Sequence, residues 1–448
     1  MVKKFPSLLL SALIFISCSK EQESNGSTEP ETNVLETNAP EASTTKPNIL
    51  LIIADDMGLD ASPGYPIGTV KPNMPNLELM ITDGIRFNNV WANPTCTPTR
   101  ASILTGKYGF RVGVTKVDDV LSTSEISLQD HLDTTAPGYA NAVIGKWHLS
   151  KNPNHPTNIG VDYYAGLIRG SAQSYTNWNL VQNGESTTSS EYITSKFSDL
   201  AIEWLAEQNS PWFLWLAYTA PHTPFHLPPD NLHTQNGLSS DQAAIEANPL
   251  PYYMAMLEAM DTEMGRVIAA LDPNVLENTI IIFIGDNGSP NQVAQQYNNR
   301  RVKGTVYQGG INVPMIVSGK GVTRRNQTEN ALINTTDLFT TIAEIAGSNF
   351  KEIHDSKSFM ELLSDANSSR LRDHVYSEIG NANGGSDYTI RNTTHKYIRF
   401  DNGEEAFYNL SSNPLEFPNL LNENQLPLSE ANAAIKASLL LKLGEIRE

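Results

Sequence analysis

Cys96 belongs to the segment Cys96-x-Pro98-x-Arg100, whose residue types and spacing could support nucleophilic chemistry. The chain has two cysteines, and the other is Cys18. At the start of a helix, the positive helix end favours a thiolate and attracts anionic ligands. Most free cysteines are instead small buried residues, and the position alone leaves that alternative open. The segment therefore identifies Cys96 as a candidate nucleophile that faces an anion.

Two other clusters offer only oxygen ligands. They are Asp55-Asp56 and Asp286-Asn287, and each follows an apolar run. Ca²⁺ and Mg²⁺ prefer carboxylate and amide oxygens, and the absence of histidine and cysteine from both clusters argues against zinc. Adjacent acids are also common as helix caps, and Asp-Asn-Gly is common as a turn. Two such clusters at strand ends of one sheet favour a metal site.

The elements that must position these residues are four apolar, β-rich runs, each followed by a polar cluster. The runs and their clusters are 48–54 with Asp55-Asp56, 142–145 with Lys146 and His148, 212–216 with His222, and 279–284 with Asp286-Asn287. Continuous apolar strands belong to a sheet that is covered on both faces and is usually parallel. Such sheets bind ligands beyond the carboxyl ends of their strands. We therefore expect all four clusters to converge on one edge of one sheet.

Helical segments alternate with these strands. Apolar residues recur at helical spacing in 195–207 and 252–271, and a further helical run, 332–346, closes the large domain at Gly347. This alternation predicts the α/β class, with a large, mostly parallel mixed sheet between helices in a domain of residues 46–365. Shorter alternating runs then precede a turn at 401–403, so residues 366–448 are predicted to form a C-terminal subdomain with a short antiparallel sheet.

The N-terminus has the pattern of an export signal. Lys3 and Lys4 precede the apolar residues 8–16, a stretch too short to span a bilayer, and Cys18 follows. We predict a lipoprotein signal peptide over residues 1–17 and lipidation of Cys18, with an ordinary signal peptide as the alternative. Residues 18–45 are rich in Glu, Asn, Ser and Thr and are predicted to form a disordered tether. The expected product is an exported lipoprotein, anchored to a membrane in the periplasm or at the cell surface of a Gram-negative bacterium.

The chain is large and acidic. Its 448 residues are 40% hydrophobic, enough for a large core, and its formal charge of -18 becomes -20 without Lys3 and Lys4 of the signal. That charge argues against nucleic acid as a partner. An anionic substrate therefore requires a local cluster of Lys, Arg, His or metal.

Residues 93–108 resemble the signature of the type I sulfatases, in which Cys-x-Pro-x-Arg directs conversion of the cysteine to formylglycine. Thr99 stands where that family often has Ser. Further resemblance lies in residues 145–149, 220–225 and 303–314, and in an aromatic strand followed by an Asn-Pro-x-Glu turn at 405–416. Within 303–314, Gln308 and Asn312 replace a Glu and an Arg that relatives often carry. The resemblance covers residues 46–421.

The resemblance implies an alkaline-phosphatase-like fold, formylglycine at position 96 as a built-in cofactor, and a Ca²⁺ ion in preference to Mg²⁺. By position in the matching motifs, it assigns the metal to Asp55, Asp56, Cys96, Asp286 and Asn287. It places Lys146 and His148 against the formylglycine and the sulfate, Lys303 on the sulfate, and His222 near the bridging ester oxygen. Arg100 either braces the modified side chain or serves only as a maturation signal.

We therefore predict a sulfuric ester hydrolase that acts on a sulfated small molecule or polysaccharide after maturation by formylglycine-generating machinery. One alternative is a phosphonate or phosphodiester hydrolase on the same fold. Another is a non-catalytic, glycan-binding surface lipoprotein. Candidate residues for a sugar pocket, which could equally serve packing, are Arg169, Tyr175, Trp178, Arg301 and Tyr307.

Overall fold

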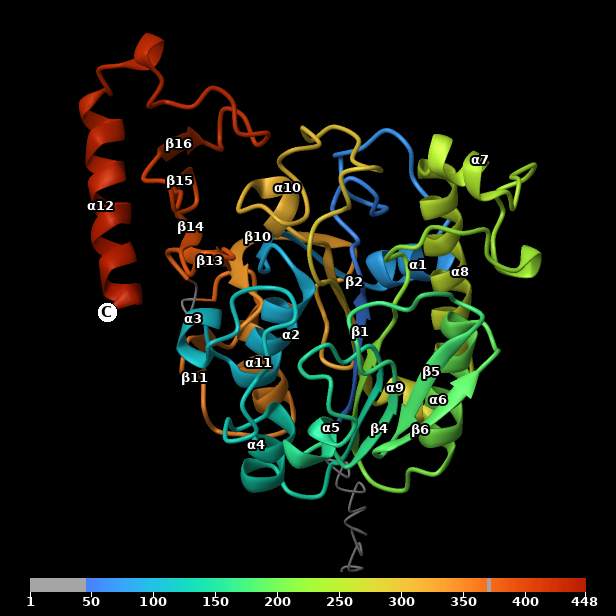
Figure 1. Ribbon diagram of the computed structural model, residues 1–448. Helices are drawn as coiled ribbons and strands as arrows, with labels where there is room; N and C mark the ends of the chain where they lie inside the picture. Colours follow the sequence, from blue (N-terminus) through green and yellow to red (C-terminus); the bar gives the residue numbers. More distant parts are fainter. Residues whose placement is uncertain (1–45, 369–371) are drawn as a thin grey trace, which may run out of the picture. The chain divides into compact units, whose positions relative to one another are not determined.

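The computed structural model describes residues 46–368 and 372–448, and its central element is a ten-stranded mixed sheet (Figure 1). In sheet order the strands are β10 (Gln327–Asn334), β2 (Gly84–Trp91), β9 (Met315–Gly319), β8 (Thr279–Gly285), β1 (Asn48–Ala54), β7 (Trp212–Ala217), β3 (Ala140–Gly145), β4 (Tyr163–Gly166), β5 (Trp178–Gln182) and β6 (Glu185–Ser189). Strands β8, β1, β7 and β3 are adjacent and parallel. The predicted mostly parallel sheet is confirmed, and its four apolar runs end at one edge.

Helices cover both faces of this sheet, which is why its central strands are apolar on both sides. In β1, Leu50 and Ile52 belong to one core cluster, while Ile49 and Leu51 belong to the other. The first cluster includes residues of α1 (Pro75–Asp83), α6 (Ile193–Ala206) and α8 (Leu250–Ala269), and the second includes residues of α2 (Cys96–Thr105), α4 (Leu128–Thr135) and α11 (Asp337–Ile345). Figure 1 shows α6 and α8 on one side of β1 and α2 and α11 on the other.

Two of the three predicted helices are confirmed by α6 and α8. The predicted helix over 332–346 is wrong at its start, because residues 332–334 complete strand β10 and pair with β2. Helix α11 begins only at Asp337. Short apolar runs suit a buried strand as well as a helix, so periodicity alone placed this boundary too early.

The C-terminal residues form a second, four-stranded antiparallel sheet of β13 (Val375–Gly380), β14 (Ser386–Arg391), β15 (His395–Arg399) and β16 (Glu405–Asn409). This confirms the predicted short antiparallel sheet. Helix α12 (Glu430–Arg447) contacts it and was not predicted, because few of its residues, such as Leu439 and Leu443, are buried. All described residues belong to one compact unit, and the predicted domain boundary at 365/366 stays a prediction.

The predicted signal peptide, Cys18 and the predicted tether lie outside the described residues. No helix among residues 46–368 and 372–448 has the length and apolar character needed to cross a membrane. The remaining short helices and strands are α3 (Gly109–Val112), α5 (His155–Asn158), α7 (Gln242–Ala247), α9 (Pro273–Glu277), α10 (Gln308–Ile311), β11 (Glu352–Ile353) and β12 (Ser356–Lys357).

Candidate active site

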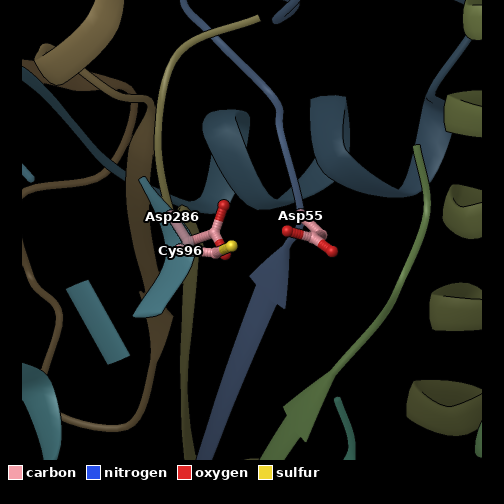
Figure 2. Close-up of side chains that lie close together, drawn as sticks. All are labelled: Asp55, Cys96 and Asp286. Carbon is pink, nitrogen blue, oxygen red and sulfur yellow. The ribbon is translucent and has the colours of Figure 1, made fainter. Parts of the chain in front are cut away.

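The carboxyl ends of the central strands bring the predicted clusters together. Asp55 follows β1 and Asp286 follows β8, and these strands end side by side, with Ala54 paired to Gly285. Cys96 opens helix α2, and one ligand atom from each of Asp55, Cys96 and Asp286 lies within 4.8 Å of the others. Figure 2 shows these three side chains close together at the end of β1. The expected convergence of the strand-end clusters is therefore present.

Three buried carboxylates at this edge are each hydrogen-bonded to one cation, and Arg100 Nη2 also lies 3.8 Å from Asp55 Oδ1. The pairs are Lys146 Nζ to Asp55 Oδ2 at 2.6 Å, Arg100 Nη2 to Asp286 Oδ2 at 2.8 Å, and Lys303 Nζ to Asp56 Oδ2 at 2.5 Å. The three negative and three positive charges balance. Buried ion pairs contribute little net stability because desolvation offsets their attraction. A cluster of this kind is instead typical of a functional site.

Two buried oxygens in the cluster, Asp55 Oδ1 and Asn287 Oδ1, have no hydrogen-bond partner among the described residues. Burial raises the pKa of the Asp55 carboxyl well above its usual range; Lys146 opposes this shift, and Asp286 and Asp56 add to it. A cation beside Asp55 would relieve the repulsion and engage both free oxygens. The residues present therefore fit a hard divalent ion held by Asp55, Asp286 and Asn287.

Asp56 is bound differently from the other predicted metal ligands. Its Oδ1 accepts a hydrogen bond from Asn287 Nδ2 at 2.8 Å, and its Oδ2 faces Lys303. Burial raises its pKa, but Lys303 and His222 outweigh that effect and hold the pKa below its usual value. Its φ of 71° lies in the left-handed region, which is strained for a residue with a side chain and is typical of functional positions. A role for Asp56 in binding metal stays a prediction.

Cys96 is the first residue of α2 and is only 2% exposed. Burial raises the pKa of its thiol, although Lys146 opposes the shift. Reactive thiols have a lowered pKa, so this thiol is a poor nucleophile as it stands. Arg100 lies one turn further along α2, where it bonds Asp286 and the carbonyl oxygen of Lys146, the latter at 2.7 Å. Arg100 therefore braces the acidic edge rather than the sulfur itself.

Asp118 is a site residue that the sequence analysis missed. His148 Nδ1 lies 3.2 Å from Cys96 Sγ, and His148 Nε2 lies 3.0 Å from Asp118 Oδ1. Because a carboxylate only accepts, the proton of neutral His148 sits on Nε2 and its Nδ1 faces position 96 as an acceptor. Burial and the charge of Lys146 lower the pKa of His148 to about 2, which keeps the ring neutral. His148 and Asp118 both have a backbone in the left-handed region, with φ of 59° and 66° respectively.

Asp118→Asn tests whether this contact positions His148. The amide can donate to His148 Nε2 and so favour the wrong tautomer, and we expect kcat to fall by about 10- to 100-fold with little change in KM. Lys151→Met is the matched control. It removes the ion pair between Lys151 Nζ and Asp118 Oδ2, which are 3.0 Å apart, and leaves the contact between Asp118 and His148 in place. Steady-state kinetics of both variants with one aryl sulfate provide the measurement. Equal losses in the two variants would contradict the tautomer argument.

His222 lies beyond β7 with its Nε2 3.8 Å from Asp56 Oδ2. Its Nδ1 donates to the carbonyl oxygen of Thr223 at 2.7 Å, which leaves Nε2 facing the site. Burial lowers the pKa of His222 to about 4, and the charge of Asp56 opposes this shift. Tyr175 supports the loop because its hydroxyl donates to the carbonyl oxygens of His222, at 2.6 Å, and Thr219. Tyr175 therefore positions this histidine loop rather than lining a sugar pocket.

A cavity of about 460 Å³ is lined by Asp56, Thr223 and Lys303. Thr223 directly follows His222 in the chain. Apart from Pro290, the rest of its lining is polar and comprises Asn291, Gln292, Asn299, Arg300 and Thr305. We call it the sugar pocket, after the carbohydrate substrate that the sequence predicts. The predicted pocket residues lie elsewhere: Trp178 is buried in the core and Arg169 is exposed. The Arg301 guanidinium carbon lies 4.4 Å from the centre of the Tyr307 ring, and Arg301 donates a hydrogen bond to the Glu416 carbonyl oxygen. Its neighbour Arg300 is the arginine that lines the pocket.

Gln308 and Asn312 have neutral roles where relatives often carry a Glu and an Arg. Gln308 Oε1 accepts from the Trp91 indole at 2.9 Å, and Asn312 Oδ1 accepts from the Val90 backbone at 3.0 Å. A buried pair from the C-terminal part stands nearby: Lys396 Nζ donates to Glu416 Oε1 at 2.7 Å, while the Gln308 backbone donates to Glu416 Oε2 at 2.8 Å. The charged pair of this region is therefore Lys396 with Glu416.

Known proteins resemble this chain along most of its length. The family model described as Sulfatase matches residues 47–348, and that described as N-sulphoglucosamine sulphohydrolase, C-terminal, matches residues 298–446. Arylsulfatase G of Mus musculus is 27% identical over 364 residues, 67% of this chain and 65% of that protein. N-acetylgalactosamine-6-sulfatase of Sus scrofa is 28% identical over 345 residues, 67% of this chain and 62% of that protein. The chain thus spans slightly less than two thirds of these relatives.

Solved structures share the fold at lower sequence identity. A structure described as in complex with its substrate D-glucosamine-2-N, 6-O-disulfate superposes with a TM-score of 0.75 at 20% identity, over 90% of this chain and 98% of that one. The structure of Ps i-CgsB in complex with k-i-k-neocarrahexaose also gives a TM-score of 0.75, at 22% identity, over 90% of this chain and 92% of that one.

Proposed function

We propose that this chain, which belongs to the sulfatase family, hydrolyses sulfate esters to an alcohol and inorganic sulfate. The observation that carries the proposal is the buried edge where Cys96, Asp55 and Asp286 meet. Because the three ion pairs there balance in charge, a bound divalent ion leaves a positive excess. That excess attracts a monoanionic sulfate ester within an otherwise acidic protein.

We propose that formylglycine replaces Cys96 and that Ca²⁺ is the metal. Once formed, the hydrated aldehyde supplies an oxygen nucleophile with a second hydroxyl, which an ordinary serine lacks. A bound ion would be held by Asp55, Asp286 and Asn287 and would supply Lewis-acid polarisation of a sulfate oxygen. The two buried oxygens without a hydrogen-bond partner support the metal, and the segment Cys96-x-Pro98-x-Arg100 supports formylglycine.

The chain's own side chains then divide the remaining tasks. Lys146 and Lys303 put positive charge beside the region where sulfate oxygens become more negative. His148 presents Nδ1 to position 96, where it can accept a proton. His222 presents Nε2 to the mouth of the site, where its protonated form donates to the leaving alcohol, and the negative charge of a bound ester raises its lowered pKa.

His222→Gln separates this acid role from simple binding. A sugar alcohol is a poor leaving group that needs a proton, whereas a nitrophenolate leaves without one, so we expect a loss of about 10²- to 10⁴-fold on a sulfated sugar and a much smaller loss on nitrophenyl sulfate. His233→Gln is a matched control, because His233 Nε2 lies 3.3 Å from the Pro228 carbonyl oxygen and the ring does not contact Tyr175. Rates on both substrates give the measurement, and equal losses on both would refute the acid role.

The substrate we propose is a sulfated carbohydrate. The sugar pocket offers amide donors and acceptors from Asn291, Gln292 and Asn299, which suit hydroxyl groups, and Arg300 suits a second anionic group. Release of inorganic sulfate from a panel of defined sulfated oligosaccharides tests the proposal. No release from any member, by protein that carries formylglycine and Ca²⁺, would support the glycan-binding alternative. The export signal and Cys18 lipidation remain part of this proposal, since delivery outside the cytoplasm suits an external polysaccharide.

A further inference from the structure

A second cavity, of about 350 Å³, shares no lining residue with the sugar pocket. Strand β2, the segment between β1 and α1, and the C-terminal part contribute to its lining, and its volume lies within the range of small-molecule sites. Its lining includes two arginines and four asparagines, which are Arg86, Arg391, Asn88, Asn89, Asn312 and Asn330. No acidic residue of the described part of the chain lines it. We call it the arginine cavity. Its composition is unusual in a chain with 49 acidic and 31 basic residues.

Arg391 is a buried cation that bonds no carboxylate among the described residues. It is 4% exposed, and its guanidinium donates to the carbonyl oxygens of Asn392, at 2.9 Å, and Thr393, at 3.0 Å, and to Asn89 Oδ1 at 3.1 Å. These acceptors are neutral, so they fix its orientation without balancing its charge. Burial lowers the pKa of Arg391 to about 10, which Glu416 only partly offsets. An unbalanced buried charge is costly unless an anion joins it.

Arg86 adds a second guanidinium held in the same way. It donates to the carbonyl oxygen of Gly64 and, at 3.0 Å, to Thr328 Oγ1, and it lies over the Tyr65 ring at 5.2 Å. Its Nε is buried and has no hydrogen-bond partner among the described residues. Both guanidinium groups line the cavity, where each can donate charge-assisted hydrogen bonds to a planar or tetrahedral oxyanion.

The asparagines supply amide donors and acceptors that suit the hydroxyl groups of a sugar. Asn88 Nδ2 donates to Asn330 Oδ1 at 2.8 Å, and Asn89 Nδ2 donates to the Asn330 carbonyl oxygen at 2.8 Å. These amides keep further donors and acceptors for hydroxyl groups. Asn312 and Gln308 also line the cavity and carry no charge.

We propose that the arginine cavity binds an anionic sugar unit, with its sulfate or carboxylate at Arg391 and Arg86 and its hydroxyls at the asparagines. The anion site stands on the cavity alone, whereas the choice of a sugar as its carrier also rests on the proposed function. Segment 291–312 links the two sites, because Tyr297, Gln308 and Asn312 line the arginine cavity while Asn299 and Lys303 line the sugar pocket. The cavity therefore provides a second contact for a sulfated or uronic saccharide.

Calorimetric titration tests the proposal on the full chain with Ca²⁺, in a Cys96→Ser background that prevents turnover. The probes are a monosaccharide sulfate, glucuronate, the unmodified monosaccharide and inorganic sulfate. We expect the monosaccharide sulfate or glucuronate to bind at a site that Arg86→Gln weakens at least about 10-fold, through the loss of one charge-assisted hydrogen bond. Asn312→Arg should weaken binding as well, because the longer side chain fills the cavity. Arg300→Gln, in the sugar pocket, is the control that leaves this site intact. Thermal unfolding of each variant confirms that it is folded.

Each outcome decides the matter. Binding of the anionic sugars that Arg86→Gln and Asn312→Arg both weaken supports the proposal, and the better of the two sugars identifies the anion. Unchanged binding in both folded variants overturns it. Binding of inorganic sulfate that is as tight as that of the sugars and is weakened equally by Arg86→Gln also overturns it, because that result indicates a bare-anion site at this cavity. With Cys96 intact, Arg86→Gln should hydrolyse aryl sulfate at the wild-type rate. If the protein with Cys96 intact does not hydrolyse aryl sulfate but anionic sugars still bind at this cavity, the proposed function is contradicted and the anion site is still supported.

Discussion

Cys96→Ser is expected to fold, bind Ca²⁺ and lose about 10⁴-fold or more in sulfate-ester turnover. Serine occupies nearly the same volume as cysteine and can sit 2% exposed at the start of α2 without disturbing the packing. It lacks the thiol that maturation converts, and a single hydroxyl has no second hydroxyl with which to release sulfate. Loss of a nucleophile leaves only the rate enhancement that binding and electrostatics supply.

Thr99→Ser is the matched control for that prediction. Its hydroxyl, which accepts from the Asn93 backbone at 3.0 Å, is retained, and serine is the residue often found there in relatives, so activity should stay near wild type. The mass of the peptide around residue 96 should correspond to formylglycine in the wild type and in Thr99→Ser. Unmodified cysteine in a fully active enzyme would contradict the account, as would near-normal turnover by Cys96→Ser.

Removal of the divalent metal is expected to reduce turnover by at least about 100-fold and to lower the thermal midpoint reversibly. The ion balances the buried carboxylates, and a ligand at 100 times its Kd adds about 2.7 kcal/mol to folding stability. Chelation followed by stepwise return of Ca²⁺, monitored by thermal unfolding and by sulfate release, measures both effects. Recovery of stability and activity should follow the same binding curve.

Asn287→Ala refines the metal prediction. It removes the free Oδ1 without leaving a buried charge unpaired, and the Ca²⁺ concentration needed for half-maximal stabilisation should rise at least about 10-fold. Asn291→Ala, an exposed asparagine of the sugar pocket, should leave that concentration unchanged while raising KM for sulfated sugars. A Ca²⁺ response that is identical in both variants would exclude Asn287 as a ligand.

The sequence predicted the sheet edge well because its evidence was local. Continuous apolar strands followed by Asp55-Asp56 or Asp286-Asn287 report both burial and position, and parallel pairing of β1 with β8 then brings the clusters together. Asp118 could not be predicted in this way. It comes from a loop, beside an equally acidic Asp119, and only the fold brings it to His148.

The direction in which a long side chain points could not be predicted from the sequence either. The spacing of Arg100 allowed either a brace for the modified side chain or a maturation signal, and it gave no indication of the hydrogen bond that Arg100 donates to Asp286. Arg300 and Arg301 are adjacent, and only packing of Arg301 against Tyr307 shows which of them faces the sugar pocket. Such choices depend on tertiary contacts far apart in the chain, so local patterns do not encode them.

Paired steady-state rates on an aryl sulfate and the corresponding aryl phosphodiester test the central claim most directly. Both substrates are monoanions, so the charge of the site does not separate them, and the chemistry of the transferred group does. For Ca²⁺-loaded wild-type protein that carries formylglycine, we predict a higher kcat/KM for the sulfate ester, with inorganic sulfate as product. Faster turnover of the phosphodiester would contradict that claim.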